Sequence, residues 1–225
     1  MERSKLRHFK RLERNLLACY HSASSHIRQD GLSWYPRANA YALELSTRYA
    51  ITLQQSCGVI AALSPGLSWD VNKRDARDLI REYRNGSKRL PMVGCYGRKN
   101  VIKCAKILSG KTPLSVLGGY KVRSFYSNLL YPNMDYPLDI PTVTIDRHAK
   151  CCLLGDKSAI NSVVRPKEYE WIANHFRHAA SSLGLSVPAF QAVCWLQWRA
   201  TQGNLDQVAT SFDFDTATVG VSMYA

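Results

Sequence analysis

Residues 114–155 read LSVLGGYKVRSFYSNLLYPNMDYPLDIPTVTIDRHAKCCLLG. Gly118 and Gly119 separate a short apolar segment from a run in which apolar side chains recur at helical spacing, at positions 122, 125, 126, 129 and 130. Because glycine adopts positive φ at low cost, the pair predicts a tight turn that leaves backbone N–H groups uncovered at a helix start. Lys121 and Arg123 add positive charge beside these donors. The pattern is that of a phosphate-binding helical corner, although glycine pairs also form ordinary helix connections.

Asp146 is expected at or next to the start of another helix. Pro132, Pro137 and Pro141 exclude a continuous helix through 131–142, and an apolar helical face resumes at Ala149. An aspartate in this position ordinarily caps the helix. The same carboxylate, fixed and ionised beside a helix dipole, can also serve a function if it lies at a cleft.

These features resemble the helix-hairpin-helix DNA glycosylase superfamily, which includes endonuclease III. The sequence GGYKV (118–122) is similar to the family's hairpin and lysine, and TIDRH (144–148) to its aspartate segment. Two upstream stretches, VIAALSPGLSWDVNKRDA (59–76) and GCYGRKNVIKCAKIL (94–108), are similar to the helices that precede the hairpin. The matches follow the family's order and cover residues 55–155.

The resemblance implies an all-α fold of two helical lobes, with a helix-hairpin-helix motif and a cleft between the lobes. We also find no strand-dense segment in the sequence. Residues 52–149 are expected to form the lobe that carries the hairpin, and residues 1–51 with 150–204 the second lobe. Residues 205–225 would form a C-terminal tail.

The implied activity is that of a DNA glycosylase, which flips a modified or damaged base out of the duplex and cleaves its N-glycosidic bond. Lys121 matches the lysine that attacks the sugar in family members with Schiff-base lyase activity, and Asp146 matches the catalytic carboxylate. The remaining candidate site residues are expected to contact DNA, and these are Lys73, Gly118, Gly119, Tyr120, Arg123, Arg147 and His148.

The sequence departs from the family pattern in three places. Of the two glycines, only Gly119 keeps its place relative to the lysine, and the insert YPNMDYPLDIP (131–141) lengthens the separation of Lys121 from Asp146. Pro65 and Gly66 stand where many members carry a glutamine that fills the hole left by the extruded base. Three alternatives therefore stay open: a lysine that only contacts phosphate, a DNA-binding or base-modification protein on the same fold, and an RNA binder driven by charge.

The composition favours a polyanionic partner. Thirty Lys and Arg residues against 17 Asp and Glu give a formal net charge of +13, and the excess is spread along the chain. We expect double-stranded DNA as the partner of a monomeric protein. The sequence has no apolar run of transmembrane length and no signal-like apolar region, which predicts a cytoplasmic, DNA-associated protein that is neither secreted nor bound to a membrane.

Seven cysteines form no CxxC pair and no ferredoxin-like run. Their odd number argues against a complete disulfide framework, and several fall on apolar helical faces, which is typical of buried free thiols. We therefore predict no iron–sulfur cluster, no structural zinc and no other cofactor. The pair His175 and His178 has no carboxylate or cysteine at metal-ligand spacing and is expected to be structural or exposed.

In the N-terminal part, apolar positions in 5–29 form one helical stripe, and GLSWYP (31–36) is expected to turn the chain into a further helix. Trp34 and Tyr35 at this turn could stack on a base, but core packing is the more common role of such a pair. Near the C-terminus, Phe190, Val193, Cys194 and Trp198 share one face of a predicted helix and are expected to face the core.

Overall fold

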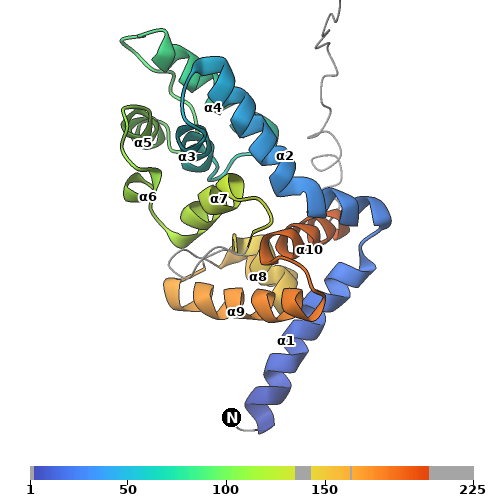
Figure 1. The fold of residues 1–225 in the computed structure, drawn as a ribbon. Coiled ribbons are helices and arrows are strands. Elements are labelled where there is room, and N and C mark those ends of the chain that lie inside the picture. The colour runs from blue at the N-terminus through green and yellow to red at the C-terminus, as the bar shows by residue number, and fades with distance from the viewer. Residues whose placement is uncertain (1–2, 135–142, 163, 203–225) are drawn as a thin grey trace, which may run out of the picture.

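The computed structural model describes residues 3–134, 143–162 and 164–202 (Figure 1). Every regular element in these residues is helical, which confirms the predicted all-α class. Pro137, Pro141 and the expected tail at 205–225 lie outside the described residues. The elements are α1 (Arg3–Ser22), α2 (Ser25–Tyr49), α3 (Leu53–Leu63), α4 (Trp69–Arg84), α5 (Arg98–Leu108), α6 (Pro113–Val116), α7 (Tyr120–Leu130), α8 (Arg147–Leu154), the 3-10 helix η1 (Lys157–Asn161), α9 (Pro166–Ser182) and α10 (Val187–Thr201).

Two clusters of buried apolar side chains organise these helices. The first cluster is centred on α3, in which every residue from Ser56 to Leu63 is buried, and α2, α4, α5 and α7 pack around it. Capping at Thr52 starts α3, because the Thr52 side chain accepts from Gln55 N and the Gln55 side chain accepts from Thr52 N. A helix apolar on all sides can only be stable when it is surrounded in this way.

The second cluster joins α1, α8, α9 and α10. Phe176 of α9 and Phe190 of α10 are fully buried at its centre, with Leu12 and Leu16 of α1 against them. Val143 and Ile145, in the extended segment before α8, belong to the same cluster. These two residues therefore anchor the chain immediately before Asp146.

The helix α2 runs without a break through residues 31–36, so the expected turn at GLSWYP is wrong. Ser24 caps α2 instead, by accepting from Ile27 N. Pro36 cannot donate to the carbonyl of Leu32, and that oxygen accepts from the side-chain amide of Asn133 at 3.0 Å. Gly31 has a packing role, since a Cβ added there would lie 2.5 Å from Val193 Cα of α10.

The same helix also links the two clusters. The expected lobe boundaries place residues 1–51 together, yet α2 contributes Tyr35, Ala38, Ala42 and Leu45 to the first cluster. Its N-terminal half approaches α10 at Gly31. Trp34 packs against Tyr35, Trp69 and Phe125, so this aromatic pair takes the core role.

Buried polar side chains connect the clusters where they meet. Tyr35 Oη donates to Thr144 Oγ1 at 3.1 Å, and Asn128 Nδ2 of α7 donates to the same hydroxyl at 3.1 Å. Tyr169 Oη of α9 lies 3.0 Å from Ser124 Oγ of α7 and accepts from Ile145 N at 3.0 Å. Buried polar groups with satisfied hydrogen bonds fix one relative placement of the helices, and here they fix the segment that leads into α8.

No single helix in the described part of the chain has both the length and the apolar composition of a membrane span. The pair α9 and α10, bent by 103°, reaches these limits only when the two helices are taken together.

Candidate functional site

The turn at Gly118 and Gly119 leaves the start of α7 open. Gly119 has φ 78° and precedes α7 without a side-chain cap, whereas Gly118 does not have positive φ. A Cβ added at either glycine would meet nothing within 4 Å. No N-cap side chain accepts from the backbone N–H groups of the first turn of α7, so these donors are left for another acceptor, as anion binding at a helix N-terminus requires. The helix before the turn, α6, has only four residues.

Asp146 is the N-cap of α8, as predicted, and both carboxylate oxygens accept hydrogen bonds. Oδ1 accepts from Ala149 N at 2.9 Å, and Oδ2 accepts from the indole Nε1 of Trp195 at 3.0 Å. The cap belongs to α8 and the indole to α10, so two helices hold one carboxylate in place. Each oxygen keeps a further lone pair with which it can stabilise positive charge.

His148 and Arg199 complete the surroundings of this carboxylate. The ring of His148 lies edge-on to Trp195 with 6.4 Å between centroids, and the Arg199 guanidinium lies 4.6 Å from the Trp195 ring centroid. Burial lowers the pKa of His148, the Asp146 charge raises it, and the charges of Arg199, Arg147 and Lys121 lower it. Nδ1 of His148 is buried and has no hydrogen-bond partner among the described residues.

Lys121 reaches this group from α7. It is half-buried in the first turn of the helix, and its charge lies close enough to His148 to affect the pKa of that imidazole. Arg147 is exposed at the first position of α8. Neither Lys121 nor Arg147 forms an ion pair with a described residue, so both charges remain available to a ligand. The structure thus brings Lys121, Asp146, Arg147 and His148 to one place.

The other residues that we expect to contact DNA differ in their exposure and in the partners that they already have. Tyr120 is 46% exposed, but its ring packs against Tyr169 with 5.4 Å between centroids. Arg123 is half-buried, and its Nε is buried without a hydrogen-bond partner among the described residues. Lys73 is on α4, where its ammonium group lies 3.0 Å from the Asp70 carboxylate.

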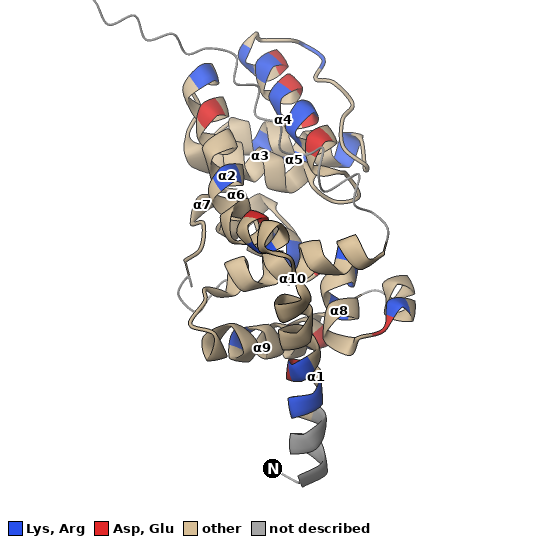
Figure 2. Ribbon diagram, turned by 90° about the vertical axis from the view of Figure 1, so that its right-hand side faces the viewer, with Lys and Arg blue, Asp and Glu red and all other residues tan. Residues whose placement is uncertain are grey.

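The basic residues of α4 and those of α5 differ in whether they already have ion-pair partners, and this affects how each helix could bind a polyanion. Lys/Arg and Asp/Glu alternate along α4 (Figure 2), and ion pairs join Arg74 to Asp75, Arg77 to Asp78, and Arg81 to both Asp78 and Glu82. A second set of cations lies on α5 and the loops on either side of it, and none of its members forms an ion pair with a described residue. This basic strip consists of Lys88, Arg89, Arg98, Lys99, Lys103, Lys106 and Lys111. In the chain, α6 and the start of α7 follow directly after Lys111.

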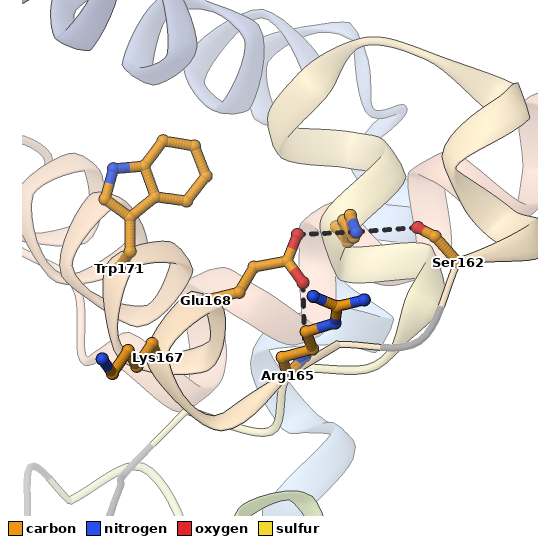
Figure 3. Close-up of a pocket in the computed structure, with 6 residues that line it drawn as sticks. Ser162, Arg165, Lys167, Glu168 and Trp171 are labelled. Carbon is orange, nitrogen blue, oxygen red and sulfur yellow. Dashed lines mark hydrogen bonds and ion pairs between the residues drawn. The ribbon is translucent and has the colours of Figure 1, made fainter.

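A separate hollow lies beside the start of α9 (Figure 3). Lys150, which is buried, donates to Ser162 Oγ at 2.7 Å and pairs with Glu168 at 2.6 Å. Burial raises the pKa of Glu168, but the hydrogen bonds from Lys150 and Arg165 N outweigh it and lower the pKa overall. The buried ammonium of Lys150 and the carboxylate of Glu168 satisfy each other, and we assign this pair a structural role in tying α8 to α9.

Sequence reasoning missed Trp195 and Arg199. Their i,i+4 spacing places them on the same face of α10, but only the packing of α10 against α8 brings that face to Asp146. On the face of α10 that the sequence predicts to be inward, Phe190, Val193 and Cys194 are fully buried.

Comparison with known proteins gives a family but no function. No curated protein and no solved structure matches the chain. A family model described as "Family of unknown function (DUF7178)" matches residues 1–202, which include every residue of the site described above. The chain belongs to that family.

Proposed function

We propose that this protein is a DNA glycosylase of the helix-hairpin-helix type, with the turn at Gly118–Gly119 as its hairpin. The observation that carries the proposal is the Asp146 group: a carboxylate fixed by Ala149 N and Trp195, with His148 beside it and the Lys121 charge within range. Lys121 and Asp146 belong to the two motifs that resemble the glycosylases. Lys121 lies in the first turn of α7, and Asp146 caps α8.

Double-stranded DNA is the proposed partner. The uncapped start of α7 would bind a backbone phosphate, and the basic strip on α5 would extend the contact along the duplex. Because the strip has no internal ion pairs, phosphate binding there would not require the separation of existing charge pairs. The extruded nucleotide would have to reach the carboxylate of Asp146.

In the proposed reaction the neutral amine of Lys121 attacks C1′ of the target deoxyribose. The C1′–N bond breaks, its electron pair leaves with the base, and the departing base takes up a proton. Loss of the amine proton and opening of the sugar ring then give a Schiff base between Lys121 and C1′. Positive charge develops on the sugar as the base leaves, and the ionised Asp146 stabilises it.

Trp195 and His148 would act through Asp146. The indole N–H fixes one oxygen of the Asp146 carboxylate. The lone pairs that remain free on this carboxylate would then keep one orientation relative to the substrate. His148, whose pKa is lowered chiefly by burial, would be neutral near pH 7 and add no positive charge next to the developing cation.

A second candidate is a DNA-binding or base-modification protein that keeps the fold without this chemistry. Two observations favour it: α6 has only four residues, and Tyr120 beside the turn is packed against Tyr169. The first helix of the hairpin is therefore short, and a residue beside the turn is already packed, whereas the glycosylase motif implies a full hairpin that is open to DNA.

Abasic-site formation distinguishes the two candidates. Duplexes carrying uracil, oxidised pyrimidines, 8-oxoguanine or alkylated bases are incubated with the protein and then with alkali, which cleaves DNA at abasic sites. We expect cleavage at one class of base, abolished by Asp146→Asn, with DNA affinity retained. Asp156→Asn is the matched control, because Asp156 also caps a helical turn but lies away from the site. DNA binding without cleavage at any of these bases, or at hypermodified bases added to the panel, would favour the binding protein.

A further inference from the structure

Three cysteine thiols from three different helices converge in the second cluster. Cys19 of α1, Cys152 of α8 and Cys194 of α10 have their sulfur atoms within 4.8 Å of one another. Cys152 and Cys194 are 1% and 0% exposed, and Cys19 is half-buried. The residues are far apart in the sequence, so their spacing could not indicate the group.

The present hydrogen bonds of these thiols are weak. Cys19 Sγ donates to the carbonyl of Cys194 at 3.4 Å, and Cys194 Sγ donates to the carbonyl of Leu16 at 3.6 Å. A thiol is a poor donor, so the departure of these protons sacrifices little hydrogen-bond energy. A single disulfide would use two of the three sulfurs and leave the third unpaired.

We propose that Cys19, Cys152 and Cys194 form a three-thiolate site for a soft metal ion. Metal–thiolate bonds of about 2.3 Å would place sulfurs around one ion roughly 4 Å from each other. The three sulfurs already lie within 4.8 Å of one another, so little movement is needed. Thiolate ligands select soft or borderline ions, of which copper(I) and zinc(II) are the physiological examples. Binding would release the thiol protons to solvent.

The surroundings suggest how the two ions would differ. Among the described residues, no histidine or carboxylate joins the three sulfurs. Copper(I) accepts three sulfur ligands alone, whereas zinc(II) would need a fourth ligand, and the half-buried side at Cys19 is where a water molecule could supply it.

A metal at this position would stiffen the support of the Asp146 group. Cys152 lies in α8, which Asp146 caps, and Cys194 directly precedes Trp195, which donates to Asp146. The ion would join these two helices to each other and to α1. The site is nevertheless defined by its three sulfurs alone, so metal binding can be tested whether or not the protein is a glycosylase.

The test is metal titration of the reduced full-length protein without oxygen. Cobalt(II), as an optical probe for zinc, and copper(I), held by a competing chromophoric chelator, are added in separate experiments. We expect one ion per chain with a thiolate-to-metal charge-transfer band. X-ray absorption of the loaded protein should show three sulfur neighbours at about 2.3 Å. A fourth, lighter neighbour identifies the zinc-type site, and its absence identifies the copper-type site.

Variants show which sulfurs bind. Cys19→Ser, at the half-buried edge, should weaken binding by more than the roughly 10–100-fold that removal of an outer-shell partner causes. Cys151→Ser is the matched control, because Cys151 is the buried neighbour of Cys152 but lies outside the group, with its thiol donating to the carbonyl of Lys157. Fewer than three sulfur neighbours in the wild-type spectrum, equal binding by Cys19→Ser, or no binding of either ion would overturn the proposal. The wild-type spectrum decides the matter even if a variant does not fold.

Discussion

Asp146 has a structural role as the cap of α8, and we propose a chemical role for the same carboxylate. As an N-cap it would be needed for α8 in any protein, and this use alone accounts for its bond to Ala149 N. The bond from Trp195 is different, because a cap does not require an indole from a distant helix. That second bond, with the cationic groups around His148, is what makes Asp146 a candidate for chemistry.

The hydrogen bond from Trp195 can be removed while an aromatic ring is kept at this position. Trp195→Phe keeps an aromatic ring but lacks the N–H donor, and a hydrogen bond to a charged group contributes about 1.5–3 kcal/mol. We expect the rate of base release under single-turnover conditions to fall by about 10–100-fold, because the carboxylate is no longer fixed. The control is Trp198→Phe, one turn nearer the end of α10. Equal rates for both variants would show that Trp195 does not position Asp146.

His148 makes stability depend on pH. Its folded pKa is lowered from the ordinary value of 6.5, chiefly by burial, so between the two pKa values the unfolded chain binds more protons than the folded chain. The free energy of unfolding should therefore decrease as the pH falls below about 6.5. Above that pH, His148 should contribute no pH dependence to the free energy of unfolding.

Urea unfolding between pH 5 and 8 tests this, with His148→Gln compared with wild type. The decrease toward low pH should be smaller in His148→Gln. His178→Gln, at an exposed position of α9, should follow the wild-type curve. If the His148→Gln curve also runs parallel to wild type, burial of this imidazole does not control acid stability.

At the scale of helices, local patterns predicted much of the fold and little of its packing. Apolar periodicity located α7 and the all-α class, and the restart of an apolar face after the prolines located the cap at Asp146. The same rules failed at residues 31–36. Gly31 permits the close approach of α10, and Pro36 leaves the carbonyl of Leu32 free to accept from Asn133. Both depend on residues more than 90 positions away, which a local pattern cannot contain.

The candidate site shows the same limit. Lys121, Asp146 and His148 stand in motifs and can be predicted from them, whereas Trp195, Arg199 and the three-cysteine group require the packing of α10 against α8 and α1. Lys73 also stands in a motif, but its ion pair with Asp70 appears only in the folded α4.

The close approach of α2 to α10 gives a prediction about stability. In Gly31→Ala the new methyl group would meet Val193 Cα at 2.5 Å, so the two helices must separate. We expect the free energy of unfolding to decrease by about 1–3 kcal/mol, the usual range for overpacking. Gly118→Ala is the control, because a Cβ there meets nothing within 4 Å and the residue does not have positive φ. Chemical denaturation measures both, and an unchanged midpoint for Gly31→Ala would contradict the tight packing.

For DNA binding by the whole molecule, we expect the net charge of +13 to matter less than the position of the cations that have no ion-pair partner. Four cations of α4, from Lys73 to Arg81, pair with acids of the same helix, whereas no cation of the basic strip pairs with a described residue. DNA affinity should therefore depend on α5 much more than on α4, although the two helices carry similar numbers of basic residues.

Paired charge removal tests this. Replacing Lys99 and Lys106 by glutamine should weaken DNA binding and reduce the slope of log K against log salt by about 0.9 for each phosphate that is no longer neutralised. Replacing Arg74 and Arg77, which are ion-paired on α4, is the matched control and should have little effect. Equal effects from the two pairs would mean that total charge, and not the strip, determines binding.

The central claim, that Lys121 and Asp146 act together on a deoxynucleotide, is tested most directly by trapping the Schiff base. The protein is incubated with the panel of modified duplexes in the presence of borohydride, and the site of any covalent adduct is found by peptide mass spectrometry. We expect an adduct on Lys121 that is absent in Lys121→Ala and strongly reduced in Asp146→Asn. An adduct on another lysine, or base release that persists unchanged in Lys121→Ala, would contradict the claim.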